Sequence, residues 1–168
     1  MAVRHRRDAR CAAWLPALML TLNGIDELVA RVGSELGTSE WHEITQERIT
    51  AFAHATDDFE DIHLDPERGR RAGLGGTIAH GLYTLSLGPK FLYELYELTG
   101  HSLGLNYGFE KVRFLSPVKT GARVRMIATL VEARPIEGGM RCTIRETFEI
   151  EGESTPACVA DSIVAYFH

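Results

Sequence analysis

The chain has 168 residues, of which 45% are hydrophobic, and these values predict one domain with a substantial core. Its formal net charge of −5 argues against nucleic acid as the main partner. The three cysteines, Cys11, Cys142 and Cys158, follow no CxxC pattern, and an odd number cannot pair completely within one chain. We therefore expect a reducing, cytoplasmic setting.

The N-terminal region differs in character from the rest of the chain. Met1–Arg10 contains four arginines, and a mostly apolar run follows over residues 11–22. A signal peptide has this shape, but no small-x-small cleavage site follows, and the run is too short to span a bilayer. We expect residues 1–21 to be an extension, either disordered or read from a start codon upstream of Met19, and residues 22–168 to form a single domain.

The N-terminal half predicts short elements around an acidic loop. Residues 26–32 predict a short helix that ends at a glycine, and residues 40–44 predict a strand. Thr45 is a typical N-cap, so a longer helix should begin there. After the loop, Asp65 and Pro66 predict another short helix, as its cap and its first helical residue.

The C-terminal half changes from a helical pattern to a strand pattern. Residues 78–98 are apolar nearly all round, which predicts a buried helix, kinked at Gly88–Pro89 and ended by Gly100. Over residues 102–167 apolar residues alternate with polar ones, which predicts antiparallel strands with a hairpin turn at Gly138–Gly139. One buried helix followed by an antiparallel meander predicts an α+β fold with the sheet wrapped around the helix.

Asp58 and His63 are the strongest candidates for catalytic residues. They lie five residues apart within Thr56–Pro66, and a carboxylate and an imidazole in one short loop suit general acid–base chemistry, because one can take a proton while the other gives one. A glycine-rich stretch, Gly73–Thr77, and then Ile78–Gly81 follow. On spacing alone, a loop-capping role for Asp58 is the simpler interpretation.

The order of these motifs resembles that of the MaoC-like dehydratases, which include the (R)-specific enoyl-CoA hydratases. Members carry a T-G-D-x-(N/Q)-x-x-H loop and then I-x-H-G at the start of a buried helix, and a second matching stretch runs here over Asn106–Phe114 and Ser116–Gly121. The resemblance covers residues 22–167 and extends to a nodulation-protein-N-like branch. It implies the hot-dog fold, in which an antiparallel sheet wraps a long central helix.

The resemblance implies roles for Asp58, His63 and Gly81, and His80 and Glu60 are further candidates for the site. Asp58 and His63 would hold the water that adds to a double bond. The backbone N–H of Gly81 would bind the thioester oxygen, since a helix N-terminus favours negative charge. His80 is interpreted mainly as a polar residue hydrogen-bonded at the start of the helix, and Glu60 is expected at the substrate-binding site.

The loop departs from the family pattern at three positions. Asp57 replaces a glycine, Glu60 replaces Asn or Gln, and Asp61 replaces an aromatic residue or proline. Glycine often marks a left-handed backbone position, which Asp tolerates less easily, so whether this loop permits full activity stays open. A metal site built from these three residues and His63 is disfavoured because no second histidine lies at ligand spacing, and we expect no metal.

The favoured function is hydration of trans-2-enoyl-CoA, or another enoyl thioester, to a 3-hydroxyacyl thioester, and the reverse dehydration. We expect a homodimer without nucleic-acid or membrane partners, and no cofactor beyond the coenzyme A or acyl carrier of the substrate. One alternative is a weakly active or non-catalytic hot-dog protein that binds acyl thioesters. A thioesterase is the other, but hot-dog thioesterases usually carry a carboxylate on the central helix, and Ile78–Tyr93 has none. Acyl chain length, and which of Asp58 and His63 is the acid, are left open.

Overall fold

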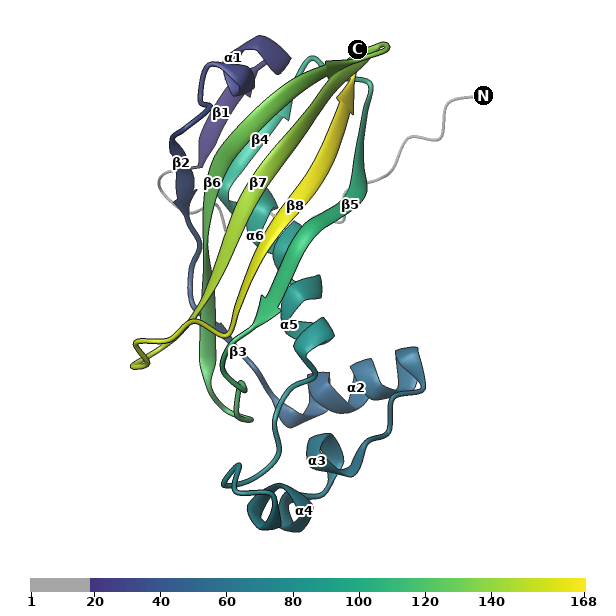
Figure 1. Ribbon diagram of the computed structural model, residues 1–168, viewed down its shortest axis with the longest axis vertical. Coiled ribbons are helices and arrows are strands. Elements are labelled where there is room, and N and C mark those ends of the chain that lie inside the picture. The colour runs from purple at the N-terminus through teal and green to yellow at the C-terminus, as the bar shows by residue number, and fades with distance from the viewer. Residues whose placement is uncertain (1–18) are drawn as a thin grey trace, which may run out of the picture.

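The structure, a computed structural model, describes residues 19–168. Its elements in chain order are β1 (Leu20–Asn23), α1 (Ile25–Val29), β2 (Glu35–Thr38), β3 (His42–Glu43), α2 (Gln46–Thr56), α3 (Asp61–Leu64), α4 (Pro66–Arg71), α5 (Gly81–Ser86), α6 (Gly88–Leu95), β4 (Tyr96–Thr99), β5 (Leu103–Phe114), β6 (Arg123–Ile136), β7 (Gly139–Ile150) and β8 (Cys158–Phe167). Figure 1 shows α5 and α6 running behind a long sheet, with α2, α3 and α4 gathered below it. The predicted α+β layout of a sheet around a helical segment is confirmed.

The sheet has six antiparallel strands in the order β2-β6-β7-β8-β5, and β3 also pairs with β6. The alternation predicted for β6 is confirmed, since its inward side chains, Val124, Met126, Ala128 and Leu130, are fully buried. The predicted meander is correct for β6, β7 and β8 but wrong for β5, which pairs with β8 at the far edge. A period of two shows that a segment is a strand but carries no information on its neighbour.

The predicted central helix is shorter than expected and divided. Residues 78–80 are not helical, α5 and α6 are separated at Leu87, and Tyr96–Thr99 forms β4, which pairs in parallel with β1 instead of extending the helix to Gly100. The break coincides with Gly88–Pro89, as predicted, and proline is tolerated in the first turn of α6. The helical segment is also not buried all round, because Leu82 and Tyr93 are exposed.

The N-terminal elements follow the predictions with shorter limits. The helix α1 ends at Val29, four residues before Gly33, and the predicted strand at 40–44 is reduced to the two residues of β3. Thr45 caps α2 as predicted, its hydroxyl accepting a hydrogen bond from the Arg48 N–H. β1 begins at Leu20, two residues before the predicted start of the domain. Residues 1–18 of the predicted extension lie outside the described residues.

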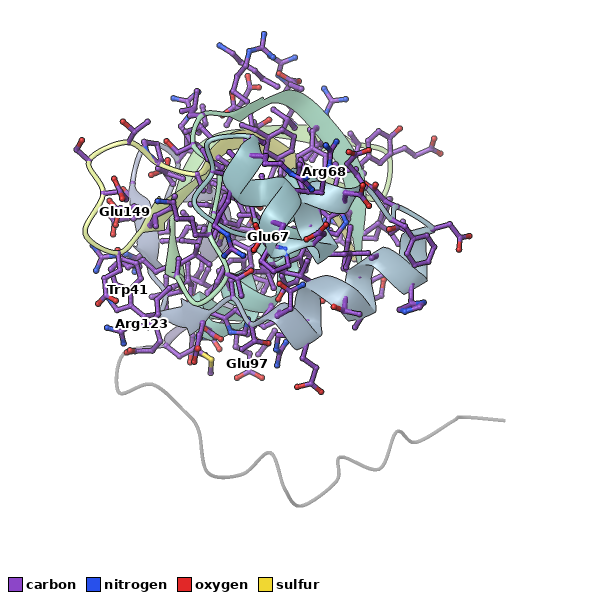
Figure 2. The ribbon with its side chains drawn as sticks, turned by 90° about the horizontal axis from the view of Figure 1, so that it is seen from below. Trp41, Glu67, Arg68, Glu97, Arg123 and Glu149 are labelled. Carbon is purple, nitrogen blue, oxygen red and sulfur yellow. The ribbon has the colours of Figure 1, made fainter. Side chains whose placement is uncertain are left out.

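The helices α3 and α4 close the lower end of the molecule, which Figure 2 views directly, with Glu67 and Arg68 of α4 near its centre. The Asp65 carboxylate accepts a hydrogen bond from the Glu67 N–H, so the predicted cap and the Pro66 start are confirmed.

The outer face of the sheet carries cross-strand ion pairs such as Arg125–Glu149, and exposed pairs of this kind contribute little to stability. Among residues 19–168, no helix is long and apolar enough to cross a membrane.

Candidate active site

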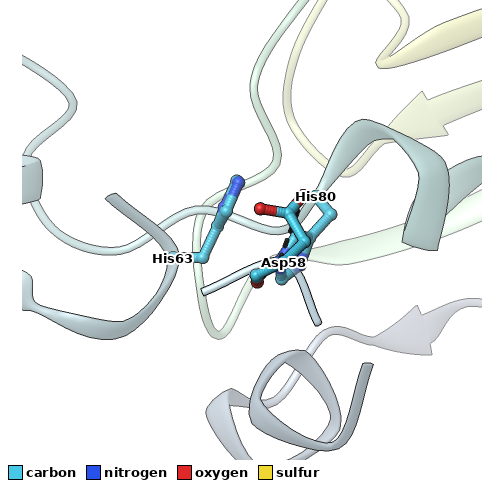
Figure 3. A group of neighbouring side chains, drawn as sticks. All are labelled: Asp58, His63 and His80. Atoms are coloured by element: carbon cyan, nitrogen blue, oxygen red, sulfur yellow. Dashed lines mark hydrogen bonds and ion pairs between the residues drawn. The ribbon is translucent and has the colours of Figure 1, made fainter. Parts of the chain in front are cut away.

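Three side chains meet where α2, α3 and α5 approach one another. Asp58 lies in the loop after α2, His63 lies in α3, and His80 immediately precedes α5. One ligand-type atom of each, a carboxylate oxygen or a ring nitrogen, lies within 4.8 Å of the others. Figure 3 shows the two imidazoles beside the Asp58 carboxylate. Both histidines are buried and Asp58 is exposed, so the group opens to solvent on the carboxylate side.

His63 is held in one orientation and one tautomer. Its Nδ1 lies 2.8 Å from the carbonyl oxygen of Ile78, and because a carbonyl only accepts, Nδ1 carries the proton of the neutral ring. The other ring nitrogen, Nε2, therefore has a free lone pair. The His63 backbone is fixed as well, since its N–H donates to the Glu60 carbonyl at 3.0 Å. The result is a buried imidazole that is ready to accept a proton at Nε2.

His80 ties the Asp58 loop to the start of α5. Its Nε2 donates to the backbone carbonyl of Asp58 at 3.0 Å and lies 4.0 Å from the carboxylate. Its ring is stacked on His63, with centroids 3.8 Å apart and planes inclined by 28°, and Phe52 lies on it at 5.0 Å. These contacts give His80 a supporting position between the loop and the aromatic side chains.

The loop that carries Asp58 begins with a left-handed residue. Asp57 has φ 56° and ψ 25°, and it is the one non-glycine residue with positive φ in the described part of the chain. The family glycine at this position therefore correctly indicated a left-handed backbone conformation. A residue with a side chain, such as Asp57, adopts that conformation at a cost of roughly 1 kcal/mol. Asp58 Oδ1 accepts a hydrogen bond from the Glu60 N–H at 3.4 Å. Glu60 itself is exposed, and its side chain does not cap α3.

Gly81 is the first residue of α5, as the predicted binding role requires, and its position has a second physical cause. A Cβ atom on Gly81 would lie 3.0 Å from the ring of Phe114 on β5. Only glycine lets the helix start approach the strand this closely without displacing the ring. This packing requirement could not be derived from the sequence, because the two residues are 33 positions apart.

Gln46 is a supporting residue that the sequence did not indicate. Its amide nitrogen donates to the carbonyl of His63 at 2.8 Å, and its amide oxygen accepts from the hydroxyl of Thr77 at 2.6 Å and of Thr120 at 3.2 Å. One side chain thus links α3 to the segment before α5 and to the β5–β6 connection. Its partners are 17, 31 and 74 residues away, so no local motif marks it.

A metal site was disfavoured from the sequence because a second histidine was missing, and that reason was wrong, since the fold brings His80 to His63. The geometry nevertheless suits an ion poorly. Nearly parallel rings do not direct their lone pairs to one point, and His80 Nε2 and His63 Nδ1 both donate to carbonyls. Asp61, a member of the acidic group considered for a metal, forms an ion pair with Arg68 at 3.6 Å.

Comparisons with known proteins agree with the architecture and with the motifs. Residues 27–151 match the family model described as MaoC like domain. The chain is 44% identical over 149 residues to 3-hydroxyacyl-thioester dehydratase Z of Mycobacterium tuberculosis, a match that covers 88% of this chain and 99% of that protein. It is also 44% identical over 140 residues to nodulation protein N of Rhizobium leguminosarum bv. viciae, covering 82% of this chain and 87% of that protein.

A solved structure supports the same assignment of fold. The (R)-hydratase from A. caviae superimposes with a TM-score of 0.64 at 22% identity, covering 76% of this chain and 92% of that chain. With the sheet and the α5–α6 segment described above, this likeness confirms the predicted hot-dog fold. The family model covers well over half of the chain, and the chain therefore belongs to the MaoC-like domain family.

Proposed function

We propose that the protein hydrates trans-2-enoyl thioesters to 3-hydroxyacyl thioesters and catalyses the reverse dehydration. The observation that carries this proposal is the free lone pair on His63 Nε2 beside the Asp58 carboxylate. A water between these groups can give one O–H to each. The relative named 3-hydroxyacyl-thioester dehydratase Z, which matches over nearly its full length, supports the same reaction class.

The proposed step uses the Asp58–His63 pair for both proton movements. The water oxygen bonds to the β-carbon as the pair removes a proton from it, the electron pair of the double bond shifts toward the thioester, and the pair returns a proton to the α-carbon. Dehydration runs through the same steps in reverse. A positioned acid or base typically accelerates such a reaction by at least about a hundredfold.

Negative charge builds on the thioester oxygen during this step, and in this proposal the backbone N–H of Gly81 stabilises it. The backbone N–H of a residue at a helix start is free of the helical hydrogen-bond ladder, and it can donate to an oxyanion. Donors of this type are worth roughly 3 kcal/mol in comparable sites. The reaction needs no redox or metal cofactor, and coenzyme A or an acyl carrier enters only as part of the substrate.

A single assay separates hydration from the two alternatives. The full chain is incubated with crotonyl-CoA, and loss of the enoyl absorbance is followed together with release of free thiol. Hydration removes the absorbance without thiol. A thioesterase releases thiol, and a binding protein changes neither signal, so either of these outcomes would overturn the proposal. The thioesterase alternative is weakened further because Glu94, the first carboxylate of α6, is already paired with Lys90.

We also propose that the protein is a homodimer of two copies related by two-fold symmetry. Eight large apolar side chains are exposed on the α5–α6 segment and on or next to β5: Leu82, Tyr93, Leu103, Leu105, Tyr107, Phe109, Phe114 and Leu115. In the described chain β5 pairs only with β8, so its outer edge is free. A long apolar edge strand is an aggregation hazard unless it is covered, and a second copy would cover it.

Sedimentation at micromolar concentration tests this assembly. The parent should sediment as a dimer, and Tyr107→Lys, which places a charge at the centre of the apolar face, should shift it toward monomer. Val131→Lys is the matched control, because Val131 is also an exposed apolar strand residue but lies on β6, away from β5. A monomeric parent, or equal dissociation by both variants, would contradict the proposal.

A further inference from the structure

A second polar group lies in a cavity farther along the α5–α6 segment. The cavity has a volume of about 650 Å³ and is lined by residues of α6, β4, β5, β7 and β8. Its walls are mainly apolar, with Leu92 and Phe109 among them, and the polar groups on it include Glu146, Tyr96 and Tyr166. Asp58 and His63 do not line it, so this cavity is distinct from the group of reactive side chains.

Glu146 occupies a position where an apolar residue would be expected. It lies on the inner face of β7 between Ile144 and Phe148, both fully buried, and is itself only 2% exposed. The helix accommodates it through Gly88, where a Cβ atom would lie 2.7 Å from Glu146 Oε2. A buried carboxylate is costly unless hydrogen-bonded, and the helix and the sheet are both adapted to keep this one.

The hydrogen bonding of Glu146 is incomplete. Its Oε1 accepts from the hydroxyl of Ser162 at 2.7 Å, and within residues 19–168 this is its one hydrogen bond. A carboxylate can accept about four, so Glu146 retains capacity for a donor that enters the cavity. Nearby, the phenol groups of Tyr96 and Tyr166 are 2.5 Å apart and bonded to each other.

The cavity and the reactive group both lie along the α5–α6 segment and strand β5. Gly81, at the start of α5, is packed against Phe114 of β5, and farther along, Pro89 of α6 and Phe109 of β5 line the cavity. Pro89 lies eight positions after Gly81, a length of about 12 Å at the rise of a continuous helix. An extended acyl chain of about ten carbons would span this length, because each C–C bond of about 1.5 Å advances the zigzag by about 1.3 Å.

We propose that the cavity receives the acyl tail of the substrate and that Glu146 makes the site prefer tails that carry a hydroxyl group. This inference rests on the proposed enoyl-thioester chemistry and names its substrate class. A hydroxyl can donate to Glu146 while its oxygen accepts a second hydrogen bond, and the apolar walls hold the methylene groups. An ammonium group would also pair with Glu146, but it would lose its hydration against apolar walls at a much higher cost.

The test compares two medium-length trans-2-enoyl-CoA thioesters of equal length, one plain and one with a terminal hydroxyl. The parent should prefer the hydroxylated substrate in kcat/KM by about ten- to a hundredfold, because a site built around a polar group rejects an analogue that leaves it unpaired. Glu146→Leu should remove or invert this preference. Glu149→Gln, on the outer face of the same strand, is the matched control and should retain it.

A pH series gives a readout that a purely structural role of Glu146 would not produce. Burial raises the pKa of Glu146 to about 7, so the preference of the parent should grow as the carboxyl ionises through neutral pH, while that of Glu146→Gln should stay constant. The other titratable groups beside Glu146 or on the cavity wall are Tyr93 on α6, Tyr96 and Glu97 on β4, and Cys158 and Tyr166 on β8. Burial raises the pKa of Tyr96, that of Cys158 to about 11 and that of Tyr166 to about 12. His101 lines the cavity in the parent and the variant alike.

Binding of the saturated analogues, hydroxylated and plain decanoyl-CoA-type thioesters, separates this inference from the proposed reaction. Calorimetric titration should show the same preference without turnover. If the parent hydrates both enoyl thioesters equally and binds both analogues equally, the role of Glu146 is wrong while the reaction stands. If it hydrates neither but still prefers the hydroxylated analogue, the reaction is wrong and the cavity assignment stands.

Discussion

Two polar groups lie along the α5–α6 segment, one at the start of each helix, and they are built in opposite ways. At the start of α5, Asp58 and His63 come from a loop and a one-turn helix, and the carboxylate is open to solvent. Near the start of α6, Glu146 comes from the middle of a long strand and is buried with Ser162. In our proposals the first group carries out the bond-making chemistry and the second selects the acyl tail, so each should be changeable without the other.

Replacing the reactive pair should have the largest effect. Asp58→Asn and His63→Asn should each lower kcat for crotonyl-CoA by about a hundredfold or more, since each removes a proton acceptor. Binding of saturated acyl thioesters and the midpoint of thermal unfolding should change little. His54→Asn, at an exposed histidine on α2, is the control and should keep full activity. Near-normal turnover in either site variant would contradict the proposed mechanism.

Ionisation of the buried Glu146 should also change the stability of the fold. Burial raises the pKa of Glu146 from 4.5, its value in an unfolded chain, to about 7 in the folded chain. Between pH 4.5 and pH 7 the unfolded chain therefore releases a proton that the folded chain keeps. The contribution of Glu146 to the free energy of unfolding should therefore be largest below pH 4.5 and fall by on the order of 3 kcal/mol as the pH rises to about 7.

Urea unfolding at several pH values measures this loss of stability. Glu146→Gln cannot ionise, so the difference in unfolding free energy between parent and variant should change across this range and level off above about pH 7. Glu149→Gln, an outer-face carboxylate with Arg125 as partner, should follow the parent. A parent and a Glu146→Gln variant with parallel curves would show that this carboxyl does not titrate in the neutral range.

The sequence was informative where the relevant residues are close together in the chain. The loop around Asp58 and His63, the caps at Thr45 and Asp65, and the left-handed position at Asp57 all depend on neighbouring residues, and the structure contains each of them. The family and the hot-dog fold could be predicted for the same reason, because the motifs that identify them are local and ordered.

Features that depend on distant contacts could not be predicted. The pairing of β5 with β8 depends on where the chain crosses the end of the sheet, not on the alternation within β5. His80 meets His63 because Ile78 is held beside α3 by a backbone hydrogen bond to Ile62 and by the His63 ring, and Glu146 is one polar residue in an otherwise apolar row. In each case the decisive partner is far away in the sequence.

A smaller effect is expected from Gln46, which supports the reactive end without contacting substrate. Gln46→Ala removes the donor to the His63 carbonyl and the acceptor for the Thr77 hydroxyl, so kcat should fall by about tenfold with little change in KM. Glu47→Ala, at the next residue of α2 and exposed, is the control. A rise in KM at constant kcat would show that Gln46 acts on binding and not on the position of His63.

The smallest effect is expected at Glu60, where the family has Asn or Gln. An ionised Glu cannot donate a hydrogen bond and adds negative charge beside Asp58, so Glu60→Gln should raise kcat/KM at neutral pH. Because Glu60 is exposed and its charge is screened by water, we expect the gain to be about threefold or less. Asp61→Asn, which removes a neighbouring exposed charge paired with Arg68, is the control.

If the pH–rate profiles of Glu60→Gln and the parent overlay, Glu60 faces solvent and the departure from the family has no catalytic consequence. A larger gain would mean that the side chain turns toward the reactive group when substrate binds, and that the acidic loop limits the rate of the parent.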